Sequence, residues 1–223
     1  MWDPVWEDVF INQSWGSYPG EDLIRFVARN FYRHEVRSNI HVLEIGCGPG
    51  ANLWFLAREG FSFAGIDGSA SAIELASKRL DNEIPDWRSR GSLHVGDVER
   101  LPFANSTFDA VIDNECIYCN SWESSVDIYN EMARVTKHGG KLFSRTFASG
   151  SWGDSTGTRL GENFWLCSEG PLCGKGPARF TKREDIRNLI QNFRIDTVEE
   201  LQRTELHGVQ RIIELLILGT KES

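Results

Sequence analysis

The chain has 223 residues, of which 40% are hydrophobic and 25% are charged, as is usual for a soluble globular domain. Its 24 Lys and Arg residues against 32 Asp and Glu residues give a net charge of −8. This argues against nucleic acid as the main partner, because phosphate binding normally uses a basic surface. The sequence has no run of about 18 apolar residues, so we expect no membrane span.

The start of the chain and its cysteines indicate a reducing compartment. Asp3, Glu7 and Asp8 stand where a secretory signal would have a basic start and an apolar run. The five cysteines are an odd number in a chain too long to need disulfide staples. We therefore expect a cytoplasmic protein with reduced thiols.

Short buried strands alternate with helical stretches in the first two thirds of the chain. Apolar runs predict strands over residues 41–45, 61–67, 92–97, 108–114 and 140–147. Helical periodicity predicts helices over residues 50–59, 69–80 and 122–135. This alternation predicts a Rossmann-like α/β fold, a doubly wound and mostly parallel sheet with helices on both faces. Ligands of such sheets bind outside the carboxyl ends of the strands.

The last third of the chain has a different composition. Residues 147–179 hold seven of the 21 glycines, which is typical of a lid or a binding loop. Thr181 and Glu184 form a capping box that predicts a helix over residues 181–192. Apolar runs at 195–201 and 211–218 predict two strands that complete a seven-stranded sheet as an antiparallel pair at its edge.

A glycine loop follows the first predicted strand. Gly46 allows a tight turn, Gly48 lets a ligand approach the backbone, and Gly50 opens the next helix. Asp67 ends the second strand about 20 residues later, where a carboxylate can bind both hydroxyls of a ribose. Capping of the following helix is the alternative role for Asp67. The order of these elements predicts a site for an adenosine-containing cofactor.

The identity of that cofactor is a separate question. The loop also satisfies the dinucleotide fingerprint G-x-G-x-x-A, at Gly46, Gly48 and Ala51. Three features argue against NAD: the proline inside the loop, a second acidic strand end at Asp97, and Glu44, which would repel a pyrophosphate but attract a sulfonium or ammonium. An NAD-dependent oxidoreductase remains the alternative.

These segments resemble the class I S-adenosylmethionine-dependent methyltransferases. The resemblance covers residues 42–147 and rests on four motifs, at 44–50, 65–69, 96–109 and 131–140. That family usually has proline where this chain has His138, a difference in a turn and not at the cofactor site. The resemblance implies methyltransferase activity with S-adenosyl-L-methionine as cofactor and no metal.

The resemblance also assigns site residues. It implies that Asp97 and Val98 contact adenine, with an ordinary turn position as the alternative for Asp97. It also implies that Glu44 lies at the methionine end of the cofactor, with anchoring of the glycine loop as its alternative role. Trp2, Trp6 and Phe10 fall at helical spacing, which fits a helix packed on the sheet rim. The resemblance implies instead that this N-terminal segment, with Trp15 and Tyr18, folds across the cofactor. The full set of expected cofactor-binding residues is Glu44, Gly46, Cys47, Gly48, Gly50, Asp67, Gly68, Ser69, Asp97, Val98, Asn114, Trp15 and Tyr18.

Residues 114–119 follow the fourth strand, which flanks the methyl-transfer site in the resembled family. Glu115 is the candidate catalytic residue, as a general base, and a hydrogen bond to the cofactor is its alternative role. Cys116 and Cys119 have C-x-x-C spacing, but no suitable His pair or second cysteine pair accompanies them. We therefore expect thiols that line a pocket rather than a zinc site.

The sequence as a whole predicts one methyltransferase domain acting on a small molecule. We expect a helical cap over 1–38, a cofactor-binding core over 39–147, a glycine-rich lid or acceptor loop over 148–180, and a closing helix and strand pair over 181–223. The expected assembly is a monomer or a homodimer. A non-catalytic module that binds an adenosyl ligand is a further alternative.

Overall fold

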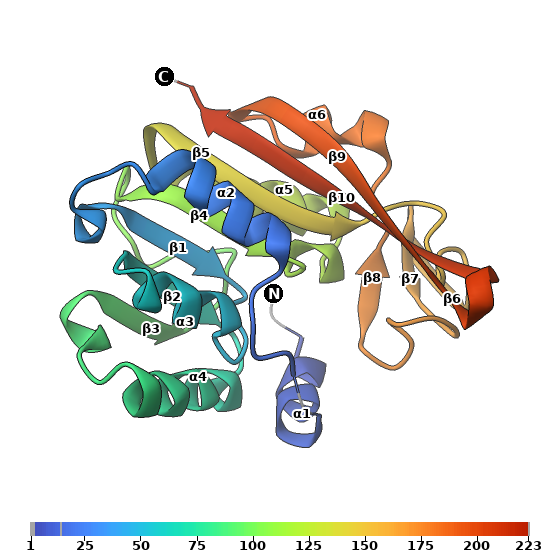
Figure 1. Ribbon diagram of the computed structural model, residues 1–223. Coiled ribbons are helices and arrows are strands. Elements are labelled where there is room, and N and C mark those ends of the chain that lie inside the picture. Colours follow the sequence, from blue (N-terminus) through green and yellow to red (C-terminus); the bar gives the residue numbers. More distant parts are fainter. Residues whose placement is uncertain (1–2, 14, 223) are drawn as a thin grey trace.

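A computed structural model describes residues 3–13 and 15–222. Seven strands form one sheet in the order β3-β2-β1-β4-β5-β10-β9 (Figure 1). These strands are β1 (His41–Ile45), β2 (Ser62–Asp67), β3 (Gly91–Val95), β4 (Phe108–Asn114), β5 (Thr136–Phe147), β9 (Phe193–Glu205) and β10 (Gln210–Lys221). Strands β1 to β5 run parallel, and β10 pairs antiparallel with both β5 and β9. The predicted fold class is confirmed; the reversed strand, β10, lies one place in from the outermost strand.

Helices cover both faces of this sheet because its central strands are apolar on both sides. Val42, Ala110 and Ile112 pack beneath α2 (Glu21–Phe31) and α3 (Ala51–Arg58). Leu43 and Val111 point the other way, toward α5 (Trp122–Val135) and α6 (Ile186–Leu189). Figure 1 shows α2 in front of the sheet and α5 behind it. No helix within residues 3–13 and 15–222 is long and apolar enough to cross a membrane.

The helix predicted over residues 181–192 is shorter in the structure and starts after the expected cap. The structure has only the 3₁₀ helix η4 (Arg183–Asp185) and the four residues of α6 there. Thr181 does not cap them: it is buried, forms a parallel bridge with Ala148, and accepts a hydrogen bond on its hydroxyl from Arg179 at 2.9 Å. Tertiary contacts therefore hold Thr181 in extended backbone against the local capping signal.

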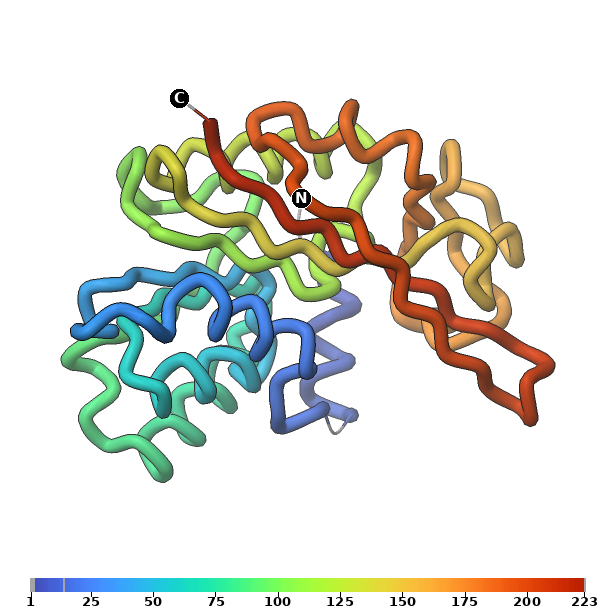
Figure 2. The backbone as a smooth tube through the Cα atoms, turned by 45° about the horizontal axis from the view of Figure 1, so that its top comes forward, coloured from blue at the N-terminus to red at the C-terminus, as the bar shows by residue number. Residues whose placement is uncertain are grey.

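The glycine-rich segment carries a small sheet of its own. Its antiparallel strands are β6 (Thr158–Gly161), β7 (Phe164–Leu166) and β8 (Pro177–Arg179). Leu172 and Phe180 of this segment pack with Tyr118, Phe147 and Ile212 of the main domain. Figure 2 shows the distal ends of β9 and β10 extending beyond the other strands beside this small sheet. The segment thus covers one end of the main sheet as a packed element.

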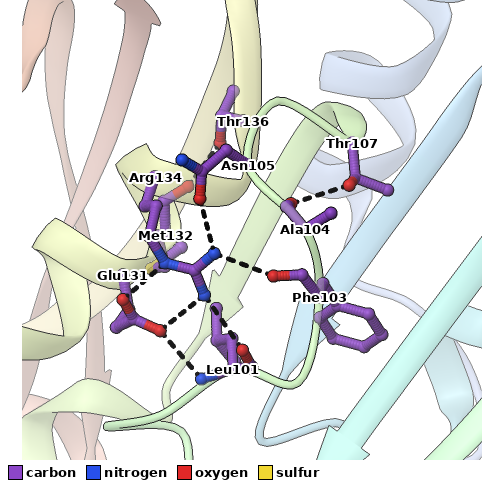
Figure 3. Close-up of polar contacts among 9 residues, drawn as sticks. All are labelled: Leu101, Phe103, Ala104, Asn105, Thr107, Glu131, Met132, Arg134 and Thr136. Carbon is purple, nitrogen blue, oxygen red and sulfur yellow. Dashed lines mark hydrogen bonds and ion pairs between the residues drawn. The ribbon is translucent and has the colours of Figure 1, made fainter.

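A polar clamp fixes the loop that leads from β3 to β4. Arg134 of α5 donates hydrogen bonds to the carbonyls of Leu101 and Phe103, at 2.9 and 2.8 Å, and to the side chain of Asn105 at 2.9 Å (Figure 3). Glu131 pairs with Arg134 and accepts the Leu101 N–H at 2.9 Å. The clamp holds this loop against α5, and the start of the same loop lines the cavity described next.

Candidate active site

A cavity of about 340 Å³ lies at the carboxyl ends of β1, β2 and β4, the edge at which parallel sheets bind their ligands. The predicted residues in its wall are Glu44, Gly46, Cys47, Gly48, Asp67, Gly68, Asp97, Val98, Asn114, Glu115, Trp15 and Tyr18. Chain segments that are far apart in the sequence are therefore brought to one place. The sequence analysis did not single out Asn52 or Leu172, which also line the cavity.

Gly50 and Ser69, predicted to bind the cofactor, lie outside the cavity wall and have another role. Gly50 begins α3 with φ +80°, and a Cβ atom there would lie 2.8 Å from the Cβ of Ala76 on α4 (Ala70–Glu83). Ser69 is the N-cap of α4, and its hydroxyl accepts the Ala72 N–H at 3.0 Å. Helix packing and helix capping therefore explain both residues.

Asp67 braces the glycine loop. One carboxylate oxygen accepts the Gly48 N–H at 2.8 Å, and the other accepts the Ser69 N–H at 2.8 Å. Burial raises the pKa of Asp67, and these two backbone hydrogen bonds oppose that rise. Each oxygen keeps a second lone pair, so Asp67 can shape the loop and still accept a ligand hydroxyl.

Glu44 has a carboxylate oxygen that lacks a protein partner. Its side chain is 2% exposed, and Oε1 accepts a hydrogen bond from the Asn52 side chain at 2.5 Å. Oε2 is buried with no hydrogen-bond partner among the described residues. Burial raises the pKa of Glu44 to about 8, although the bond from Asn52 favours the ionised form. A cationic hydrogen-bond donor in the cavity would satisfy Oε2, as the ammonium group of a methionine moiety would.

The N-terminal segment closes over this cavity. Trp15 stacks edge-on against Trp6 of α1 (Val5–Asn12), with ring centroids 6.2 Å apart, and Lys175 of the glycine-rich segment lies 5.4 Å above the Trp15 ring. Glu7 of α1 accepts hydrogen bonds from the Ser71 backbone and hydroxyl at 3.3 and 2.5 Å. Residue Trp2, which the periodicity places on the same helical face, lies outside the described residues. Tyr18 lines the cavity but is 74% exposed.

Glu115 sits at the end of β4 in a left-handed backbone conformation, with φ +61°. Its Oε1 lies 3.2 Å from Nε of Arg145, which also pairs with Glu214. Burial and the neighbouring Glu214 raise the pKa of Glu115 to about 8, and Arg145 opposes the rise. Sequence reasoning missed Arg145 and Glu214, although a charged residue inside an apolar strand is a signal that could have drawn attention to them.

The two cysteines of the C-x-x-C segment both line the cavity. Cys119 donates from its thiol to the Cys116 carbonyl at 3.0 Å. Burial raises the pKa of Cys119 to about 12 and that of Cys116 well above its usual value. Both thiols are therefore protonated and unreactive at neutral pH. Among the described residues, no group of three or more His, Cys, Asp or Glu side chains could hold a metal ion.

Comparison with known proteins agrees with this geometry. Residues 42–140 match the family model of methyltransferase domains. Methyltransferase GfsG of Streptomyces halstedii is 28% identical over 145 residues, which cover 65% of this chain and 51% of that protein. The matched segment, residues 42–140, is a methyltransferase domain of the class I S-adenosylmethionine-dependent family. The phthiotriol/phenolphthiotriol dimycocerosates methyltransferase of Mycobacterium leprae is 34% identical over 47% of this chain and 37% of that protein.

The fold of this class I methyltransferase matches solved structures over most of its length. A S-adenosylmethionine-dependent methyltransferase from Methanosarcina mazei superposes with a TM-score of 0.70 at 21% identity, covering 88% of this chain and 97% of that one. The chain spans about half or less of the length of the curated relatives named above. S-adenosylmethionine is the cofactor of this family, which resolves the ambiguity of the glycine loop in favour of S-adenosylmethionine over NAD.

Proposed function

We propose that this methyltransferase transfers a methyl group from S-adenosylmethionine to a small-molecule acceptor. The observation that carries the proposal is the buried, unpartnered Oε2 of Glu44 beside the glycine loop. The cofactor brings an already activated methyl group, so the protein mainly orients the reactants and excludes water. A cavity without an obvious catalytic triad is compatible with that chemistry.

The residues around the cavity suggest one orientation of the cofactor. Glu44 accepts a hydrogen bond from the ammonium group through Oε2, and Asp67 binds the ribose hydroxyls through its free lone pairs. Asp97 and the backbone of Val98 contact adenine, and Asn114 lies near the methionine end. Trp15 and Tyr18, together with the glycine loop, cover the cofactor from the N-terminal side.

The remaining part of the cavity suggests an acceptor with an apolar body. Its wall there includes Trp6, Tyr118, Phe147 and Leu172. Relatives whose names specify a sterol or phthiotriol support acceptors of this general kind. The net charge of −8 also favours a small molecule over a large polyanion.

A second candidate function is a reaction other than methyl transfer with the same fold. The [4+2]-cyclase SpnF superposes on this chain with a TM-score of 0.66 at 15% identity. A screen of metabolites with a labelled methyl donor separates the two functions. Methyl transfer predicts a product carrying the label, whereas cofactor binding with no labelled product from any acceptor favours the second candidate.

Calorimetry of cofactor binding tests the role of Glu44. We expect S-adenosylmethionine to bind the wild type at pH 7 with release of close to one proton, because a cation beside Oε2 drives ionisation of a group whose pKa is about 8. The proton count comes from titrations in buffers with different ionisation enthalpies. Glu44→Gln should bind without this proton release and, above pH 8, more weakly by roughly 1.5–3 kcal/mol.

A matched control for this experiment is Glu74→Gln, an exposed carboxylate on α4 that pairs with Lys78. It should bind and release protons like the wild type. Equal proton release by Glu44→Gln and the wild type would contradict the assignment of Glu44. Binding of NADH without binding of S-adenosylmethionine or S-adenosylhomocysteine would contradict the proposed function itself.

A further inference from the structure

Three adjacent strands bring two carboxyl groups and one guanidinium together at the acceptor end of the cavity. Glu115 directly follows β4, Arg145 lies on β5, and Glu214 lies on the reversed strand β10. Arg145 Nε lies 3.2 Å from Oε1 of Glu115, and Arg145 Nη2 donates to Oε2 of Glu214. Glu214 is 4% exposed in an otherwise apolar stretch of β10, where an acidic side chain is costly unless it has a role.

Only one member of this cluster faces the cavity. Glu115 belongs to the cavity wall, whereas Arg145 and Glu214 lie behind it. The backbone N–H of Glu115 donates to the Arg145 carbonyl at 3.0 Å, which fixes the residue at φ +61°. A residue other than glycine is strained in that conformation, and such strain commonly occurs at functional sites. The cluster thus presents a single carboxyl group to whatever occupies the acceptor end.

The charges of the cluster favour retention of one proton. Two carboxyl groups held side by side disfavour ionisation of both, and only 32% of the Glu115 side chain is exposed to water. Burial and Glu214 raise the pKa of Glu115 to about 8, with Arg145 and Arg203 opposing. The groups that face the pair are Arg145 of β5, Arg203 of β9, Tyr118 of η3 (Ile117–Cys119) and, behind Arg145, Asp22 of α2.

We propose that Glu115 removes the proton of a protic acceptor atom during methyl transfer, and that Glu214 is the positioning residue that makes Glu115 a strong enough base. This inference rests on the proposed function. The acceptor is then an alcohol, a phenol, an amine that bears a proton, or an acidic carbon. Carboxylates, thioethers and tertiary amines, which carry no proton to remove at neutral pH, are not acceptors.

Methyl transfer with Glu115 as the base is a single displacement reaction. As the acceptor proton moves to a carboxylate oxygen of Glu115, the electron pair that it leaves forms the new bond to the methyl carbon. The bond between that carbon and the sulfonium sulfur breaks, and its electron pair stays on sulfur as a neutral thioether. Glu115 then returns the proton to water. General-base catalysis of this kind is usually worth about 10²–10⁴-fold in rate.

The proposed effect of Glu214 on the protonation of Glu115 can be tested without any acceptor. Carbon-13 NMR of the full chain, labelled at the glutamate side-chain carboxyl carbons, would follow each carboxyl from pH 5 to pH 10. We expect a resonance with a midpoint near 8 that disappears in Glu115→Gln and moves at least one pH unit lower in Glu214→Gln, where the negative neighbour is gone. Glu44 should give a second high midpoint that both variants retain.

The control variant for this titration is Glu200→Gln, an exposed carboxylate on β9 of the same hairpin, which should leave both midpoints unchanged. Thermal unfolding of each variant checks that the fold is kept. An ordinary midpoint for Glu115, or an unchanged one in Glu214→Gln, would overturn the role of Glu214. This readout is independent of cofactor binding, so failure of the proposed function would not be mistaken for failure of the pair.

Turnover tests the catalytic part with the acceptor that the metabolite screen identifies. We expect kcat to rise with pH to a plateau above about 8, as the reactive form of Glu115 is the ionised one. Glu214→Gln should shift that rise to lower pH with little change in KM. Glu115→Gln should lose about 10²–10⁴-fold in kcat with cofactor affinity retained. Wild-type kcat in Glu115→Gln, or a product methylated on a carboxylate, thioether or tertiary amine, would overturn the proposal.

Discussion

Two carboxyl groups at the ends of neighbouring strands have opposite surroundings, and this difference suits them to different parts of one ligand. Both carboxylate oxygens of Asp67 accept hydrogen bonds from backbone N–H groups, whereas one carboxylate oxygen of Glu44 is buried without a hydrogen-bond partner among the described residues. Asp67 therefore shapes the site before any ligand binds. Glu44 gains its missing interaction only from a ligand, which makes it the residue whose protonation should respond to cofactor binding.

Replacement of Asp67 by alanine tests this division of roles. We expect Asp67→Ala to weaken cofactor binding by roughly 1.5–3 kcal/mol, the usual loss for hydrogen bonds to a charged group. It should also lower the stability of the free protein, because the N–H groups of Gly48 and Ser69 lose their acceptor. Calorimetry and urea unfolding measure the two effects. Unchanged affinity with an intact fold would remove Asp67 from the ribose site.

At the scale of elements, the loop between β3 and β4 depends on one side chain of α5. Arg134 supplies hydrogen bonds to two carbonyls of that loop and to Asn105, and Glu131 completes the clamp. The same loop begins with Asp97 and Val98 in the cavity wall. The contact explains physically why the two motifs, at 96–109 and 131–140, belong together in one domain.

Removal of this clamp should destabilise the domain and loosen the loop. We expect Arg134→Ala to lower the free energy of unfolding by roughly 1–3 kcal/mol, because partly buried carbonyls lose their donors. Urea unfolding measures the loss, and amide exchange at Leu101 should become faster. Lys78→Ala, which removes an exposed ion pair on α4, should change stability by less than about 0.5 kcal/mol. Equal effects of the two substitutions would show that the clamp carries no stability.

The glycine-rich segment should respond to ligands more than the main sheet does. Its strands have only three or four residues each, and Leu172 and Lys175 between β7 and β8 line the cavity. We expect faster amide exchange in residues 148–179 than in β1 and β4 of the free protein, with partial protection once cofactor and acceptor are bound. Mass spectrometry measures this exchange. Equal protection of residues 148–179 in the free and the ligand-bound protein would show that the segment is a fixed structural element.

At the scale of the whole molecule, one buried and one partly buried acid couple stability to pH in an unusual direction. The pKa values of Glu44 and Glu115 are raised to about 8, so the native state keeps protons that the unfolded chain releases above its ordinary carboxyl pKa of about 4.3. The native state therefore binds more protons throughout this window. The contribution of these groups to stability is full in mild acid and is lost as pH rises toward 8.

Urea unfolding across this pH range tests the coupling. We expect the free energy of unfolding of the ligand-free protein to fall by roughly 2–5 kcal/mol between pH 5 and pH 8. Glu44→Gln should reduce the fall, since the amide does not titrate. S-adenosylmethionine should also reduce it, because a cation beside Glu44 stabilises the ionised form. A free energy of unfolding that rises steadily over the same range would contradict the raised pKa values of these two carboxyl groups.

The sequence alone determined the local features of this protein. The glycine loop at Gly46 and Gly48, the short continuous apolar runs and the acid at Asp67 each depend on a few neighbouring residues. Together they predicted the parallel sheet and its ligand-binding edge. The same local reasoning failed at Thr181, because a bridge to Ala148 outweighs a capping signal.

Only the tertiary structure decided which distant residues meet. Glu214 pairs with Arg145 because the antiparallel register of β10 against β5 sets Glu214 opposite Phe147, although 69 residues separate Glu214 from Arg145 in the chain. Register depends on the packing of both faces of the sheet, and no local pattern specifies it fully. For the same reason, the sequence indicated Glu115 as a candidate, and the fold supplied the partners that determine when this carboxyl group holds its proton.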